Sequence, residues 1–312
     1  MAPDSGRTAG PNGVLVVDKP AGPTSHDVVA LVRRLAGTRR IGHGGTLDPF
    51  ATGVLPLFLG SATRLVEYHA RDRKVYRATV CFGASSTTDD LEGELQPAPF
   101  PASRDVVEAA LAGLLGEIVQ RPPALSAIKV AGRRAYARAR AGERVEIPER
   151  VVTIHEIHLR EWDERDPERP VAVIDVTCSA GTYIRALARD LGAAVESAAY
   201  LGALVRMASG PFRIETAASM DELRQAAAEG AAAFAGLLLP PDAGLDALPV
   251  IELSEAQVGD IARGRFITTG SAPQAGEPGP IRLVAPDGRL VGVGFARDGR
   301  LAPDKVFVTA ER

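Results

Sequence analysis

The chain has 312 residues, of which 46% are hydrophobic and 24% charged, a composition typical of a globular protein with one large and one small domain. No apolar run reaches the roughly 18 residues that span a bilayer, and residues 1–12 lack the apolar core of a signal peptide, so we expect no membrane partner and a disordered leader. The net charge of −3 does not exclude a nucleic-acid partner, because the acidic residues are unevenly distributed. Residues 215–260 hold nine acidic residues and one basic residue, so the rest of the chain has a positive net charge.

Basic residues gather in three parts of the chain that could form a cationic face for a nucleic acid, although each cluster could also be an ordinary solvated surface. The clusters are Arg33, Arg34, Arg39 and Arg40; Arg71, Arg73, Lys74 and Arg77; and Lys129, Arg133, Arg134, Arg138 and Arg140.

Cysteine and histidine give no sign of a disulfide framework or a metal site. Cys81 and Cys178 lie in separate strand-like runs, which is typical of reduced thiols in a cytoplasmic protein. His155 and His158 flank Glu156 in a run with strand character, where residues three apart face opposite sides. We therefore predict no metal ligands here.

The first predicted elements are a strand over residues 13–18, a turn from Lys19 to Pro23, and a helix from Asp27 to Leu35 that Thr24 or Ser25 can cap. Lys19 lies at the strand end, where the following loop could bring it to a cleft. A lone lysine beside a turn is more often simply exposed.

Residues 42–65, GHGGTLDPFATGVLPLFLGSATRL, place Asp48 between a glycine cluster and a proline. Gly42, Gly44 and Gly45 allow positive φ and close approach to a ligand, while Pro49 favours an extended Asp48. The apolar run that follows predicts a buried or edge strand despite its internal proline. By itself, an Asp beside Gly and Pro is more often a turn former than a reacting group.

Residues 74–82 alternate as a strand that turns Tyr76 inward with Ala78 and Val80. Residues 84–96 are polar and acidic and predict a loop, to which we assign no function. Residues 103–118 predict a helix with Ser103 as a cap and an apolar stripe of Val106, Ala110 and Leu114.

The second half of the chain begins with a buried strand, residues 171–178, followed by a helix that Thr182 can cap. On that helix Ile184, Leu187, Ala188 and Leu191 form one stripe, and Arg185 lies in the first turn beside it. Residues 219–238 predict an Ala-rich acidic helix. Residues 247–312 contain turn dipeptides between strand-like runs and predict a small β-rich module.

Several ordered blocks resemble the TruB-type tRNA pseudouridine synthases. They are KPAGPTS, the 42–65 segment, the K-x-Y strand, CSAGTYIRALARDLG, and YLGALVRMASGPF. The resemblance implies an α+β fold with a mixed, mainly antiparallel sheet flanked by helices over residues 13–245. It also implies a mobile RNA-binding arm near residues 120–150 and, more loosely, a PUA-like RNA-binding module over residues 247–312.

The resemblance further implies isomerisation of uridine to pseudouridine in the T-arm loop of tRNA, at position 55, by a cytoplasmic monomer that flips the target base. Asp48, Tyr76 and Arg185 would be the catalytic residues, with Asp48 as the carboxylate, Arg185 as its ion-pair partner and Tyr76 as the stacking surface. His43 would occupy the space left in the RNA loop. Lys19, Arg64, Tyr183 and Leu204 complete the implied substrate-binding set. The reaction needs no redox cofactor, and a nearby Arg185 would lower the pKa of Asp48 and keep it ionised.

Other activities lack their motifs in this chain. The glycine cluster has neither the GK[ST] of a phosphate-binding loop nor the spacing of a dinucleotide fingerprint, and the PCxxC of a zinc deaminase is missing. The remaining alternative is a non-catalytic RNA-binding or RNA-folding protein, which would use the arm and the C-terminal module without Asp48.

Overall fold

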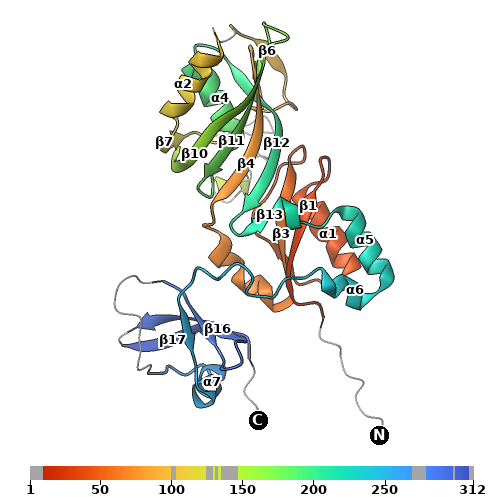
Figure 1. Ribbon diagram of the computed structural model, residues 1–312, viewed down its shortest axis with the longest axis vertical. Coiled ribbons are helices and arrows are strands. Elements are labelled where there is room, and N and C mark those ends of the chain that lie inside the picture. The colour runs from red at the N-terminus through yellow and green to blue at the C-terminus, as the bar shows by residue number, and fades with distance from the viewer. Residues whose placement is uncertain are drawn as a thin grey trace.

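The computed structural model describes residues 10–99, 103–123, 129–130, 133–134, 147–268, 279–297 and 299–308. Within these ranges the chain forms a large sheet with helices against it and a separate small sheet near the C-terminus (Figure 1). The predicted α+β class is confirmed.

The large sheet has the order β1-β3-β12-β4-β11-β10-β7, with β2 added to β3 and β13 added to β12. Its strands are β1 (Gly13–Lys19), β2 (Ile41–His43), β3 (Thr52–Leu59), β4 (Lys74–Phe82), β7 (Gly116–Gln120), β10 (Arg150–Asp163), β11 (Val171–Cys178), β12 (Ala199–Ser209) and β13 (Phe212–Arg213). Neighbouring strands pair antiparallel except β3 and β12, which pair in parallel, so the predicted mainly antiparallel sheet is confirmed.

Two groups of helices cover this sheet at its two ends (Figure 1). The helices are α1 (Ser25–Leu35), the 3-10 helix η1 (Gly60–His69), α2 (Arg104–Gly113), α4 (Ile184–Ala194), the 3-10 helix η2 (Ile214–Thr216), α5 (Met220–Glu229) and α6 (Ala231–Gly236). Apolar side chains of α1, α5 and α6 pack on β1 and β3, whereas those of α2 and α4 pack on β4, β11 and β12.

Local sequence explains where α1 begins and how β4 faces the core. Thr24 accepts a hydrogen bond from the Asp27 amide and the Asp27 carboxylate accepts one from the Thr24 amide, which is a capping box. In β4 the side chains alternate between buried and half-buried, with Tyr76 on the buried face as predicted. The β4 prediction is confirmed.

Three helix predictions were wrong in detail. The helix predicted over residues 103–118 ends at Gly113, because residues 116–120 pair with β10 as strand β7; its buried residues are Val107 and Leu111, whereas Val106 is 40% exposed. The helix predicted over residues 219–238 is two helices, since Gly230 between them has φ of 120°. Tyr183, not Thr182, is the N-cap residue of α4, and Thr182 donates to the Ser179 carbonyl instead.

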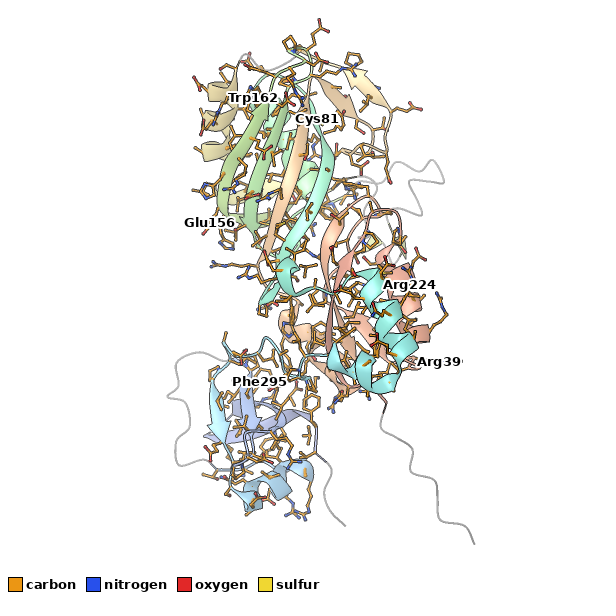
Figure 2. The ribbon with its side chains drawn as sticks, turned by 45° about the vertical axis from the view of Figure 1, so that its right-hand side comes forward. Arg39, Cys81, Glu156, Trp162, Arg224 and Phe295 are labelled. Carbon is orange, nitrogen blue, oxygen red and sulfur yellow. The ribbon has the colours of Figure 1, made fainter. Side chains whose placement is uncertain are left out.

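The C-terminal module consists of β14 (Val250–Glu252), α7 (Glu255–Ala262), β15 (Ile281–Val284), β16 (Leu290–Arg297) and β17 (Arg300–Val306). The four strands form one sheet in chain order around their own apolar core, with Phe295 on β16 visible in Figure 2. Two minor hairpins, β5 (Ala84–Ser86) with β6 (Leu95–Pro97) and β8 (Lys129–Val130) with β9 (Arg133–Arg134), complete the strands of the described residues.

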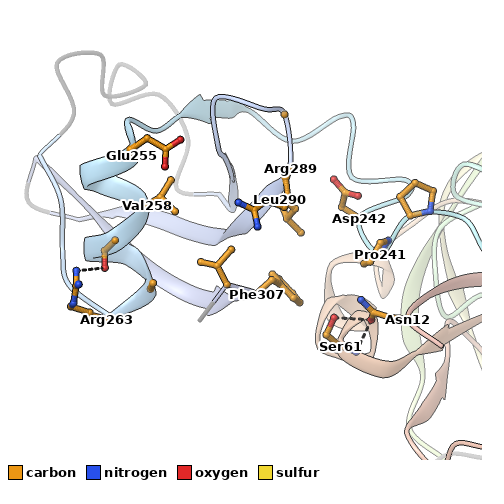
Figure 3. A pocket seen from close by; sticks show the side chains of 15 residues that line it. Asn12, Ser61, Pro241, Asp242, Glu255, Val258, Arg263, Arg289, Leu290 and Phe307 are labelled. Carbon is orange, nitrogen blue, oxygen red and sulfur yellow. Dashed lines mark hydrogen bonds between the residues drawn. The ribbon is translucent and has the colours of Figure 1, made fainter. Parts of the chain in front are cut away.

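The module lies against η1 of the large domain across a crevice of about 950 Å³ (Figure 3). Arg64 donates to the Val306 carbonyl at 2.6 Å, Tyr68 donates to Asp304 at 2.9 Å, and Lys305 pairs with Glu67 at 3.0 Å. These contacts fix how the small sheet is attached.

Parts of two predictions lie outside the described residues. They are the leader up to residue 9 and most of the arm predicted near residues 120–150. Of the leader, Asn12 is described, and its side-chain oxygen accepts hydrogen bonds from Ser61. In the described ranges, no helix has both the length and the apolar character to cross a bilayer.

Candidate active site

A cavity of about 410 Å³ opens between the glycine-rich loop after β2, strand β4, the start of α4 and strand β12. Its lining includes six residues that the sequence singled out: His43, Asp48, Tyr76, Tyr183, Arg185 and Leu204. Residues from four separate regions of the chain thus meet at one place.

Asp48 forms an ion pair with Arg185 at the cavity wall. The Asp48 Oδ2 and Arg185 Nε atoms are 3.1 Å apart, and the Arg185 side chain is only 6% exposed while that of Asp48 is 36% exposed. Arg185 is buried because α4 presents it beside the stripe that packs on the sheet. The Asp48 carboxylate is therefore accessible from the cavity, while the buried Arg185 guanidinium fixes its position through the ion pair.

Asp90 is a second carboxylate on Arg185 that sequence reasoning missed. Its Oδ2 accepts from Arg185 Nη1 at 3.0 Å, and Nη1 also donates to the Thr88 carbonyl. Its Oδ1 accepts from the Glu92 amide, so Asp90 is fixed within the loop after β5. Asp90 lies in the TTDD stretch to which we assigned no function, and its adjacent Asp89 pairs with Arg189 instead.

The charge state of Asp48 depends on competing effects. Burial is the largest and raises the pKa of Asp48 above its ordinary value of 3.8, Arg185 lowers it, Asp90 raises it and Lys19 lowers it. The net direction is upward, and Arg185 opposes the effect of burial, as the sequence analysis expected. Arg185 also pairs with Asp90, and the charge of Asp90 raises the pKa of Asp48 further.

Three buried side chains hold the backbone of the Asp48 loop. Lys19 Nζ donates to the carbonyls of Pro20, Pro23 and Pro49. Ser25 Oγ accepts from the Leu47 amide and donates to the Leu47 carbonyl. Arg206 donates to the carbonyls of Gly45, Thr46 and Val54. Their hydrogen bonds bracket Asp48 on both sides in sequence.

Lys19 therefore serves the loop and does not line the cavity, although the sequence placed it in the substrate-binding set. It is fully buried, which lowers its pKa to about 8. Ser25 and Arg206 were missed as loop anchors; the only sequence signal was their position inside blocks that resemble the family. Ser25 is free for this contact because Thr24 is the residue that caps α1.

The glycines near Asp48 differ in what they do. Of the three that we expected to adopt positive φ, only Gly45 does so, at 136°. Gly53, at the start of β3, has φ of 98°, and a Cβ there would lie 2.4 Å from the Arg206 carbonyl oxygen. Gly53 is thus required for β3 and β12 to approach each other behind the cavity.

Tyr76 and Leu204 form an apolar wall of the cavity, and both are more than 90% buried. Burial raises the pKa of Tyr76, while the adjacent Arg206 opposes that increase. Tyr183 lies on another wall, where Gln120 accepts from its amide at 2.8 Å and donates to its carbonyl at 3.0 Å. Gln120 is a further positioning residue that sequence reasoning missed.

His43 and Arg64 occupy contrasting places. His43 lines the cavity, its Nδ1 accepts from the Gly45 amide at 3.3 Å, and burial lowers its pKa, so the ring is neutral. Arg64 does not line the cavity: it contacts Val306 and lies over the Phe307 ring at 5.3 Å. The described residues contain no cluster of three or more His, Cys, Asp or Glu that could hold a metal ion.

Comparisons with known proteins show the family of the chain. The family model described as TruB family pseudouridylate synthase (N terminal domain) matches residues 33–184, and that described as tRNA Pseudouridine synthase II, C terminal, matches residues 248–308. The chain is 48% identical to a tRNA pseudouridine synthase B of Thermobifida fusca (strain YX), over 95% of this chain and 98% of that protein. A relative of the same name in Synechococcus sp. (strain WH7803) is 45% identical with the same coverage.

Among solved structures, a Cbf5-Nop10-Gar1 complex contains a similar chain, with a TM-score of 0.74 and 26% identity over 99% of this chain and 92% of that one. The sequence relatives extend over nearly the whole length, and both family models apply in order. The chain therefore belongs to the TruB family of tRNA pseudouridine synthases, enzymes that isomerise uridine to pseudouridine in tRNA.

Proposed function

We propose that this enzyme converts the uridine at position 55, in the T-arm loop of tRNA, and that Asp48 is its catalytic carboxylate. The observation that carries the proposal is the 3.1 Å pair between Asp48 and a buried Arg185 at the wall of a cavity of about 410 Å³. An oxygen that is partly exposed to a cavity yet anchored by a cation is suited to attack a bound ligand.

The reaction breaks the bond between uracil N1 and the sugar C1′, turns the uracil, and joins its C5 to C1′. C5 then loses its proton and N1, freed from the sugar, gains one, so atoms and charge balance without a cofactor. Asp48 can serve as a nucleophile at C1′ or at uracil C6, or as a base on the sugar. In each version it acts in its ionised form, which Arg185 and Lys19 favour.

The target uridine must leave the folded loop of the RNA to reach Asp48, and unstacking costs a few kcal/mol. Tyr76 and Leu204 offer an apolar wall for the flipped base, and stacking on an aromatic ring returns about 1–3 kcal/mol. His43 lies on the glycine-rich loop at the cavity edge, where it would occupy the space that the base vacates.

Binding of the rest of the tRNA is assigned to the basic residues and the C-terminal module. The exposed arginines at the end of α1 and just beyond it are Arg33, Arg34, Arg39 and Arg40, with Arg39 at the outer edge in Figure 2. Such cations would contact phosphates and confer affinity more than specificity. We further propose that the small sheet is a PUA-like RNA-binding module and that the arm near residues 120–150 covers the RNA. We also propose that the enzyme acts as a monomer in the cytoplasm.

Release of tritium from C5-labelled uridine in a T-arm stem-loop tests the proposal. We expect Asp48→Asn to release none while it still binds the RNA, because the amide has nearly the same shape but cannot act as a nucleophile or a base. A matched control is Asp175→Asn on β11, since Asp175 pairs with Arg77 away from the cavity. Turnover by Asp48→Asn, or release from a stem-loop in which only the uridine at position 55 is replaced by cytidine, would refute the assignment.

A further inference from the structure

Lys74, the first residue of β4, is a buried cation in the active-site cavity that the chemistry above does not use. It lines the cavity and is 7% exposed, yet its Nζ has no hydrogen-bond partner among the described residues. Burial lowers its pKa to about 8. An ammonium group buried without an acceptor is costly, so a ligand that supplies the acceptor would gain the interaction that the protein leaves unmade.

The groups next to Lys74 accept no hydrogen bond from its Nζ in the described part of the chain. Asp72, whose charge raises the pKa of Lys74, is hydrogen-bonded to His69 Nδ1 at 2.9 Å. Cys178 faces Lys74 in the register between β4 and β11, and burial raises its pKa to about 11, so its thiol is uncharged at neutral pH. Arg206 adds further positive charge. This side of the cavity therefore has an excess of positive charge.

Arg150 is a second cation in the same cavity with unused donors. Its guanidinium lies over the Tyr183 ring at 4.6 Å, and its Nε and Nη2 atoms are buried with no hydrogen-bond partner in the described part of the chain. The carboxylate of the cavity, Asp48, is already paired with Arg185. Lys74 and Arg150 are thus left to a negatively charged group that comes with the ligand.

We infer that Lys74, with Arg150, binds a phosphate next to the flipped uridine. This inference rests on the proposed function, which puts the base against Tyr76. Lys74 and Tyr76 lie on the same face of β4, two residues and roughly 7 Å apart, so a base at Tyr76 leaves its sugar-phosphate within reach of Lys74. A uracil carbonyl would need only one neutral donor, whereas two cations match a full negative charge.

The test combines a protein change with a neutral linkage in the RNA. Lys74→Met keeps the length and apolar stem of the side chain but removes its charge and its donors. We expect it to weaken binding of the T-arm stem-loop by roughly tenfold to a hundredfold, as for one charge-assisted hydrogen bond, and Lys74→Arg to restore part of the loss. Two further stem-loops carry a methylphosphonate linkage, one directly 5′ and the other directly 3′ of the target uridine.

When the methylphosphonate replaces the phosphate that Lys74 contacts, the wild-type enzyme and Lys74→Met should bind that stem-loop equally well. The RNA that abolishes the difference identifies which of the two phosphates is bound. Arg77→Met is the control, because Arg77 lies on the opposite face of β4, paired with Asp175, and any general loss of positive charge would appear there too. The melting temperature of Lys74→Met should not fall, since the variant removes an unpaired buried charge.

Equal losses for Lys74→Met on all three RNAs, or no loss on the unmodified one, would overturn the inference. A wild-type enzyme that binds the stem-loop but releases no tritium would instead refute the proposed function, and the Lys74 assignment with it. The two failures are therefore distinguishable in one set of experiments.

Discussion

Asp48 is partly buried, and nearby cations offset only part of what burial costs its charged form. Loss of water around the carboxylate raises the pKa of Asp48, and the positive charges of Arg185 and Lys19 lower it again in part. Arg185 is itself balanced by Asp90 at 3.0 Å, so the three groups form a chain of alternating charge. Removing one member leaves the others unmatched.

Arg185→Ala should slow turnover of the stem-loop by roughly a hundredfold or more, because two carboxylates then share the site without a cation. It should also change the pH profile of single-turnover rates. On the proposed mechanism, activity needs ionised Asp48 and falls as the pH decreases through its pKa. Because this pKa is raised, the acid limb of the wild type should lie above that of an ordinary aspartate. Loss of the largest opposing charge moves this limb to still higher pH.

Arg224→Ala is the matched control for that experiment. Arg224 pairs with Asp221 on the surface of α5, at the outer side of the molecule in Figure 2, and does not line the cavity. Its variant should have the pH profile of the wild type. An acid limb that stays in place or moves to lower pH in Arg185→Ala would contradict the assigned ion pair.

At the scale of elements, the close approach of β3 to β12 positions the site, and the break between α5 and α6 shapes the helices that cover the β1–β3 end of the sheet. Gly53 allows the first, because its missing Cβ leaves room for the Arg206 backbone, and β12 has a register shift directly after Arg206. Gly230 allows the second, and the two short helices can then both pack on α1 and the β1–β3 end of the sheet.

Gly230→Ala should destabilise the large domain by about 1–3 kcal/mol, since φ of 120° is strained for a residue with a Cβ. The contribution is from the backbone alone, because a Cβ at Gly230 would meet no atom within 4 Å. Urea unfolding followed by fluorescence of Trp162 measures it, as this single tryptophan lies on β10 of the large sheet.

Gly236→Ala, in α6, provides the comparison. A Cβ there also has open space, and Gly236 is not among the glycines of positive φ, so the substitution should be neutral or slightly stabilising. Equal unfolding midpoints for the two variants would show that the turn between α5 and α6 does not depend on glycine.

At the scale of the whole molecule, the small sheet is attached to the large domain through η1 and β17. Arg64, Glu67 and Tyr68 of η1 contact residues 304–307 of the module, and the crevice beside them opens to the surface between the two (Figure 3). Arg64 thus forms part of the interface between the two domains, although it lies in the 42–65 segment that contains Asp48.

Arg64→Met should leave the single-turnover rate on a T-arm stem-loop within about threefold of the wild type, because its side chain lies outside the cavity. It should loosen the module, which proteolysis of the connection near residues 240–248 would detect as faster cleavage. The control is Arg289→Met, a residue of the crevice lining that makes no contact with η1 among the described residues. A large loss of rate in Arg64→Met would place this arginine back in the substrate-binding set.

The sequence by itself determined most of the local elements and pointed to residues that meet at the cavity. Alternation in residues 74–82 decided which way Tyr76 faces, the capping box decided where α1 begins, and the ordered motifs singled out Asp48 and Arg185. Only the tertiary structure decided what surrounds Asp48. Asp90 reaches Arg185 across 95 residues, and Arg206 reaches Gly45 across 161, so neither contact leaves a periodic pattern in the chain. The balance between desolvation and charge that sets the pKa of Asp48 likewise exists only once these distant groups are buried together.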